Sequence, residues 1–171
     1  MNKLLACIVL SACTVSAVDV GALGDAIAAC EGGTPGAWVR ANEYGAHCVT
    51  VAVAKDWVAL HSGDACVPVS VAREALEHQY DFILAWHLAR CVARAREGGG
   101  DDMDIVRRAA AIWRAGRTGA ANGRGTEYAK RVAAVYATMV DPKQGIESVG
   151  WMCYNSGADV GEGTKEEVNA R

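Results

Sequence analysis

Apolar residues recur at helical spacing over the middle of the chain, between residues 71 and 95. They follow a turn at Pro68 and form one stripe that runs from Leu76 to Cys91. Apolar side chains at intervals of three and four positions are typical of a helix with one face toward a core. Ser70 can cap the first turn. We therefore predict one long helix over residues 71–95.

Two further helical patterns precede this one. Residues 20–29 predict a short helix that ends next to Cys30, and residues 37–61 predict a second long helix. The segment CVTVAVA within the second pattern alternates β-branched residues as a strand does. A β-strand is therefore the alternative prediction for this segment.

The pattern beyond residue 100 is also helical. An acidic start at Asp101 is followed by MDIVRRAAAIWRAG, which predicts a short helix. The segment RTGAANGRG, residues 117–125, contains too much glycine for regular structure and predicts a flexible linker. Thr126 can cap a last helix, EYAKRVAAVYATMV, which Pro142 ends. The expected fold class is all-α, a small bundle-like domain of about five helices.

The first 17 residues have the order of an export signal. A positive charge precedes an apolar run over residues 4–10, which is shorter than the ~20 residues of a membrane-spanning helix. Small residues at positions 15–17 allow a signal peptidase to cut before Val18. The overlapping LSAC, residues 10–13, is similar to a lipobox, in which residues 1–12 are removed and Cys13 is lipidated. Either cut would export the protein, and we expect it in the periplasm or, if Cys13 is lipidated, anchored to the outer membrane as a lipoprotein.

Composition limits the number of domains and the partners. About 150 residues remain after the leader, which suits a single helical domain over residues 18–154, followed by a flexible polar tail over 155–171. A net charge of −3 provides no field that would hold a polyanion, so nucleic acid is not an expected partner. No later stretch is long enough to span a membrane, and attachment would depend on a lipid at Cys13.

Five cysteines lie beyond both cleavage sites: Cys30, Cys48, Cys66, Cys91 and Cys153. Several of them are expected to pair in an oxidising compartment, and the odd number leaves one thiol over or one bond to a partner. A continuous helix would hold Cys66 and Cys91 more than roughly 30 Å apart, whereas a disulfide tolerates only ~6 Å between α-carbons. Cys30 can bridge to Cys48, and Cys66 is left for Cys153, or for Cys91 if the helix is broken. We therefore expect a disulfide-stapled domain in which Cys91 is buried and unpaired.

Polar residues of the long helix offer one candidate metal site. Glu74, His78 and Asp81 share a helical face and could provide three zinc ligands. No fourth ligand is evident, so we interpret them as a solvated polar face and expect no metal or other cofactor. His87 lies toward the apolar side and is interpreted as a packed, hydrogen-bonded core histidine.

Other residues with possible chemistry also have simpler interpretations. The five tryptophans are spread along the chain as core anchors would be: Trp38, Trp57, Trp86, Trp113 and Trp151. The glycine-rich segment from Arg117 to Gly125 could surround an anion with backbone amides, but it lacks a phosphate-loop signature. No nucleophile elbow or metalloprotease motif occurs. We expect no catalytic residues and no enzymatic activity.

Three segments resemble the first half of a known family. They are LGDAIAACEGG, AHCVTVAVAKDWVALHSGDACVP and VSVAREAL, which together cover about residues 23–78. They are similar to the periplasmic immunity proteins that protect bacteria from type VI secreted peptidoglycan amidases. Cys30, Cys48 and the triplet Cys66-Val67-Pro68 match the positions of the family's cysteines. The resemblance implies an all-helical, disulfide-bonded, often dimeric inhibitor that blocks an amidase by binding.

The function expected from the sequence is that of an exported, non-catalytic binding protein, an immunity protein or inhibitor of a peptidoglycan hydrolase in the periplasm. Its partner would be a protein, with a homodimer as a further expectation from the resemblance. The alternative is a lipid-anchored envelope lipoprotein, structural or phage-related, in which Cys13 provides the attachment.

Overall fold

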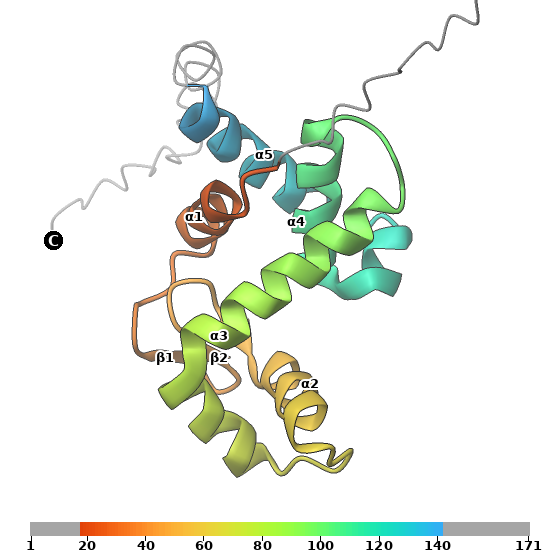
Figure 1. Cartoon of the computed structure of the whole chain (residues 1–171). Helices are drawn as coiled ribbons and strands as arrows, with labels where there is room; N and C mark the ends of the chain where they lie inside the picture. The colour runs from red at the N-terminus through yellow and green to blue at the C-terminus, as the bar shows by residue number, and fades with distance from the viewer. Residues whose placement is uncertain (1–17, 142–171) are drawn as a thin grey trace, which may run out of the picture.

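Five helices and a small sheet make up residues 18–141, the part of the chain that the structure, a computed structural model, describes (Figure 1). The helices are α1 (Val20–Glu31), α2 (Val51–Ser62), α3 (Val69–Arg96), α4 (Asp102–Ala121) and α5 (Thr126–Val140). The strands are β1 (Trp38–Arg40), β2 (Glu43–Tyr44) and β3 (Val49–Thr50). The all-α fold class is confirmed, because the three strands are short.

Local signals in the sequence define the ends of α1 and α4. The side chain of Asp19 accepts a hydrogen bond from the backbone N–H of Ala22, and Gly32 ends α1 in the left-handed conformation. The side chain of Asp101 accepts from the N–H of Asp104 in the same way at the start of α4. These helices begin where the sequence predicts because the caps act within one turn.

The predicted long helix over residues 37–61 is wrong. The segment forms the antiparallel sheet β1-β2-β3, and α2 begins only at Val51, where the hydroxyl of Thr50 accepts from the N–H of Val53. Two residues between β2 and β3 cannot be helical, since Gly45 has a φ of 76° and Cys48 a φ of 51°. The β-branched alternation was the correct signal here.

Helix α3 crosses the whole molecule and changes direction at Gln79, whose φ of −133° and ψ of 24° are not helical (Figure 1). Tyr80 follows at once and places its ring against Gly45. Its hydroxyl accepts a hydrogen bond from the backbone N–H of His47 at 3.2 Å. Through these two contacts Tyr80 connects α3, directly after its bend, to the loop before β3. Burial in this loop also lowers the pKa of His47.

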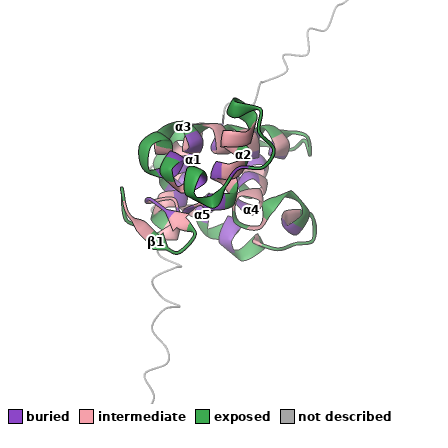
Figure 2. Cartoon of the chain, turned by 90° about the horizontal axis from the view of Figure 1, so that it is seen from below, coloured by how far each residue is buried: buried purple, intermediate pink, exposed green. Residues whose placement is uncertain are grey.

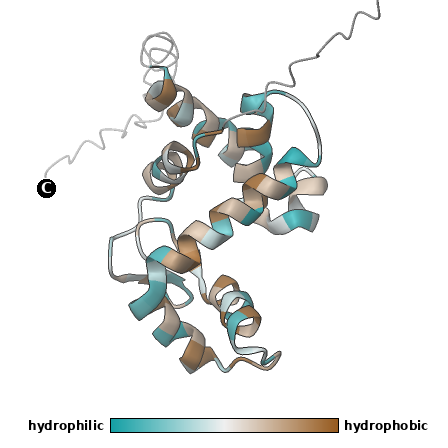
Figure 3. Cartoon of the chain, viewed as in Figure 1, coloured by the Kyte–Doolittle hydropathy of each residue, from teal (hydrophilic) through white to brown (hydrophobic). Residues whose placement is uncertain are grey.

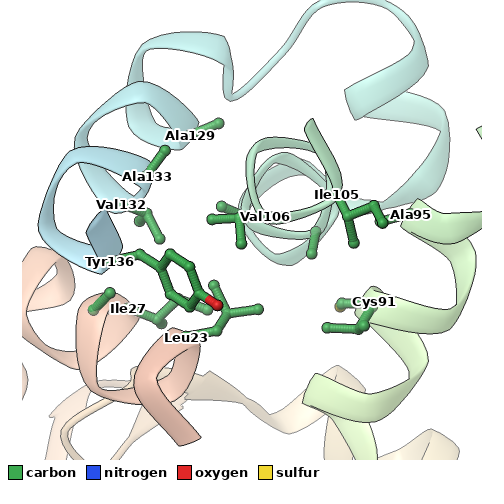
Figure 4. Close-up of a cluster of buried hydrophobic side chains, with 14 of the residues drawn as sticks. Leu23, Ile27, Cys91, Ala95, Ile105, Val106, Ala129, Val132, Ala133 and Tyr136 are labelled. Atoms are coloured by element: carbon green, nitrogen blue, oxygen red, sulfur yellow. The ribbon is translucent and has the colours of Figure 1, made fainter. Parts of the chain in front are cut away.

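Two separate hydrophobic cores lie along α3. The upper core is formed by α1, the second half of α3, α4 and α5, and its fully buried residues include Leu23, Ile27, Cys91, Val106 and Val132 (Figure 4). The lower core is formed by the sheet, α2 and the first half of α3, and includes Val49, Leu76 and Ile83. Figure 2 shows the buried residues on the inner faces of the helices.

The end of α4 differs from the prediction. Gly116 interrupts the helix with a φ of 69° and a ψ of 171°, but the chain is helical again as far as Ala121. The predicted linker over residues 117–125 is therefore wrong in its first half. Helix α5 begins at Thr126 with Gly125 as its cap, and the Thr126 hydroxyl donates to the carbonyl of Gly123.

Several predictions fall outside the described residues. They concern the leader with Cys13, the cysteine at 153, Trp151 and the tail over 155–171. Among the helices that the structure describes, none combines the length and apolar character required to cross a membrane.

Candidate functional site

A cavity of about 350 Å³ opens between the start of α2, the second half of α3 and the end of α4. We call it the arginine cleft, after the four arginines that line it: Arg90, Arg94, Arg114 and Arg117. Among the described residues, Asp56 is the one acidic residue in its lining. The lining of the cleft thus carries an excess of positive charge in a chain whose net charge is negative.

Helix geometry explains how these side chains come together. His87, Arg90, Cys91 and Arg94 are spaced three and four positions apart on α3, so they share one face of that helix. Helix α4 packs against α3 and contributes two further arginines from either side of its break at Gly116. The cleft therefore depends on the α3–α4 contact as well as on the order of residues.

Three of the four arginines have a carboxylate nearby, at rather long distances. The nitrogen–oxygen distance is 3.6 Å in the pair Arg90–Asp56, 3.3 Å in Arg114–Glu31 and 3.6 Å in Arg117–Glu97. A tight charge-assisted hydrogen bond measures about 2.7–2.9 Å. Within the described part of the chain, Arg94 makes no hydrogen bond or ion pair. The positive charge of the cleft is incompletely neutralised.

His87 and Cys91 form the floor of the cleft. The Nε2 atom of His87 lies 3.9 Å from the Cys91 sulfur, and its ring packs 4.8 Å from that of Trp113. The Nδ1 atom is buried and has no hydrogen-bond partner among the described residues. The predicted core histidine is in fact half-buried at a cavity wall, and one of its nitrogens is unsatisfied.

The environment keeps both groups neutral at pH 7. Burial, reinforced by the positive charge of Arg90, lowers the pKa of His87 to about 4. Burial also raises the pKa of the Cys91 thiol to about 12, against the opposing effect of Arg90 and Arg94. A cysteine nucleophile needs a thiolate and a nearby base or cation that stabilises it. This pair is therefore unsuited to nucleophilic catalysis.

A second, more open cavity of about 470 Å³ lies beside the arginine cleft, between α2 and α3. Asp56 and Arg90 line both cavities. The rest of its lining is apolar and includes Leu60 and Trp86, with the Arg90 guanidinium 4.4 Å from the centre of the Trp86 ring. Phe82 lies one helical turn before Trp86 on α3. We call Leu60, Phe82 and Trp86 the apolar face.

The predicted metal-ligand set is not brought together. Glu74 and His78 line a third cavity with His61, whereas Asp81 lies beyond the change of direction at Gln79 and does not line it. Among the described residues, no group of three histidine, cysteine or carboxylate side chains could hold a metal ion. The bend breaks the regular spacing on which the hypothesis relied.

The cysteines do not form the expected staples within residues 18–141. Cys30, Cys48, Cys66 and Cys91 are free thiols, so the structure lacks the predicted Cys30–Cys48 bridge. The reason lies in the sheet: Cys30 packs against the upper core, while Cys48 is buried in the turn before β3. Cys66 is exposed, and its proposed partner Cys153 lies outside the described residues. The predicted burial of Cys91 is confirmed, and it forms no disulfide within the described residues.

The prediction that the tryptophans are core anchors is confirmed in part. Each of the four that the structure describes is half-buried: Trp38, Trp57, Trp86 and Trp113. Three of them pack against the edge of a core: Trp38, Trp57 and Trp113. Trp86 belongs to neither core and lines the second cavity.

Sequence reasoning missed most of the arginine cleft. Of the four arginines in the cleft, only Arg117 was named from the sequence, as part of a segment that could surround an anion. Arg90 and Arg94 have the sequence pattern of ordinary solvent-exposed charges on a helix. The spacing of His87, Arg90 and Arg94 was the available signal. No family model, curated protein or solved structure matches this chain.

Proposed function

We propose that this chain is an exported, non-catalytic binding protein that contacts a protein partner through the apolar face. One observation carries the proposal: Leu60 is 64% exposed and Phe82 is 72% exposed, on the two helices that border the second cavity. Burying a side chain of this size is worth about 1.5–3 kcal/mol. Both side chains are therefore available for contact with a partner, Leu60 in the lining of the cavity and Phe82 one helical turn from Trp86 in that lining.

The surroundings of the apolar face support contact with a protein. Trp86 is an aromatic residue of the kind that often dominates binding energy, and Asp56 and Arg90 provide a charged rim at its edge. Figure 3 shows apolar and polar positions alternating along α3, as expected of a helix that serves two cores and an outer surface. The proposed occupant is an apolar segment of the partner flanked by charged residues.

The resemblance over residues 23–78 supports a more specific proposal, in which the partner is a peptidoglycan hydrolase of the periplasm. That region contains α2 with Leu60 and the first part of α3. The protein would act as an immunity protein or inhibitor by covering the hydrolase. The neutral His87–Cys91 pair is consistent with a role that needs no chemistry of its own.

The test is capture and inhibition with purified variants. The mature protein should capture a peptidoglycan hydrolase from envelope extracts and inhibit it, and Leu60→Asp and Phe82→Asp should each weaken both effects at least about tenfold. Met139→Asp is the matched control, because Met139 is 41% exposed but lies on α5. Capture that survives both substitutions, or a bound partner whose hydrolytic activity is unchanged, would contradict the proposal.

Disulfide staples belong to the same proposal, since an exported protein meets an oxidising compartment. Cys66 is exposed and free to react, and we propose that it pairs with Cys153. Non-reducing peptide mapping of protein isolated from the periplasm would show a linked peptide pair. Recovery of both peptides with free thiols would exclude this bridge.

The lipoprotein alternative rests on the LSAC segment at residues 10–13. In that case the protein is attached to the membrane by a lipid on Cys13 and serves as an envelope component. The intact mass of the mature chain separates the two, because diacylglyceryl addition changes it grossly. A chain that begins at Val18 without added mass would exclude lipidation.

A further inference from the structure

We propose that the arginine cleft binds a small oxyanion that carries two negative charges, of the phosphate or dicarboxylate type. The site is distinct from the apolar face and needs no protein partner. Its main features are four arginines from two helices in one lining and an Arg94 side chain that makes no hydrogen bond or ion pair among the described residues. The cavity of about 350 Å³ suits a small molecule.

The arrangement of charge favours an anion. Arg90 and Arg94 from α3 line the same cavity as Arg114 and Arg117 from α4, and Asp56 is the one acidic residue in the described lining. Glu31 and Glu97 pair with Arg114 and Arg117 from outside the lining, which leaves Arg94 as the arginine without a carboxylate partner among the described residues. Like charges that share a partly desolvated cavity repel one another, and a bound anion removes that repulsion. Cations would be repelled, and an apolar ligand would remove water from the guanidinium groups without replacing it.

The hydrogen-bonding groups favour an oxyanion in particular. A guanidinium presents planar pairs of N–H donors that match the two oxygens of a carboxylate or phosphate. The existing partners of Arg90 and Arg117 lie 3.6 Å away, beyond a tight hydrogen bond, and Arg94 has no such partner in the described residues. Donors are therefore available on both walls of the cleft.

His87 lies among the arginines in the lining of the cleft and can report on binding. Its ring packs 4.8 Å from the ring of Trp113, which holds it in place. A bound anion would change the charge around this ring, so the NMR signals of His87 should shift on binding.

The experiment is a titration of the purified mature protein, followed by heteronuclear NMR and calorimetry. Inorganic phosphate and succinate are the two probes, and sodium chloride keeps the ionic strength constant. Saturable shifts of the His87 ring and the Arg94 guanidinium with either probe support the site. Saturation with phosphate alone assigns a phosphate-type ligand, and saturation with succinate alone assigns a dicarboxylate.

A matched pair of variants separates a specific site from general attraction. Arg94→Gln should weaken binding at least about tenfold, as expected for the loss of one charge-assisted contact. Arg124→Gln removes the same charge from an exposed position outside the cleft and should change affinity less than about twofold. If Arg94→Gln fails to fold, Arg117→Gln replaces it, since Arg117 is 67% exposed.

Two results would overturn the proposal: shifts that do not saturate with either probe, or equal losses of affinity in Arg94→Gln and Arg124→Gln. Phe82→Asp should bind the anion normally, because Phe82 does not line the cleft. The anion site can thus fail while the protein partner is confirmed, and the reverse also holds.

Discussion

The upper and lower regions of the molecule differ in how completely they bury their apolar residues. The upper core has 17 buried residues, which come from four helices and from Val18 just before α1. The lower core has nine, which come from the sheet, α2, the first half of α3 and Val67 just before it. Most of the large exposed apolar residues belong to the lower region or its edge: Val39, Leu60, Val69, Val71 and Phe82. The upper region is therefore a scaffold, while the lower region keeps apolar surface available for contact.

The two proposed sites lie along the boundary between these regions. Helix α3 passes through both cores, and its second half provides Trp86 to the apolar face and Arg94 to the arginine cleft. Asp56 and Arg90 line both cavities. The well-packed upper core can hold these side chains in position, because closely packed interiors resist deformation.

The largest effect should come from a leucine in the upper core. Leu23 has no exposed surface, so Leu23→Ala should lower the free energy of unfolding by about 2–5 kcal/mol through lost burial and a residual cavity. Leu60→Ala, the same change on the 64% exposed apolar face, should cost less than about 0.5 kcal/mol. Urea denaturation measures both, and similar losses would show that Leu60 packs in solution.

The pH dependence of stability should come next. Burial lowers the pKa of His87 from 6.5 to about 4, with Arg90 and Arg94 adding to the shift and Asp56 opposing it. Between these values the unfolded chain binds a proton that the folded chain does not, so stability falls as the pH falls from about 6.5 to about 4. This contribution reaches at most about 3 kcal/mol and is constant below the lower value.

Urea denaturation across this pH range measures the effect of His87. In His87→Gln, the loss of stability between about pH 6.5 and pH 4 should be smaller by up to about 3 kcal/mol, because glutamine takes up no proton at this position. His78→Gln is the control, since His78 is exposed on the same helix. An unchanged pH profile in His87→Gln would show that the imidazole is already solvated in the folded state.

A smaller effect is expected at the junction between the sheet and α3. Gly45 has a φ of 76°, and a side chain there would overlap the ring of Tyr80. Gly45→Ala should therefore cost about 1–3 kcal/mol through backbone strain and displacement of Tyr80. Hydrogen exchange should show increased opening of β2, β3 and α2, with little change in α5. Equal opening in both regions would show that the two cores unfold as one unit.

The smallest effect on stability should come from the apolar face itself. Phe82→Asp should change the free energy of unfolding by less than about 0.5 kcal/mol, because Phe82 is 72% exposed. Thermal unfolding measures this, and it also shows that the loss of partner binding proposed above is a surface effect. A large destabilisation would instead place Phe82 in a packed interface, such as that of a homodimer.

The sequence by itself determined the elements whose signals are local. It placed helices over residues 20–29 and 71–95, and the structure has α1 at Val20–Glu31 and α3 at Val69–Arg96. The agreement arises because apolar periodicity acts within a few turns, although the predicted cap Ser70 lies inside α3 and makes no cap. It also identified Cys91 as buried. These features depend on neighbouring residues along the same helix.

Tertiary structure alone decided the sheet, the bend in α3 and both proposed sites. Gly45 and Cys48 adopt positive φ values where Tyr80 packs from a distant part of the chain, and this contact has no counterpart in local periodicity. Likewise, Arg94 and Arg117 are ordinary surface arginines until α4 packs against α3. The chemistry of the cleft arises from side chains far apart in sequence, so only the packing of the helices could bring it together.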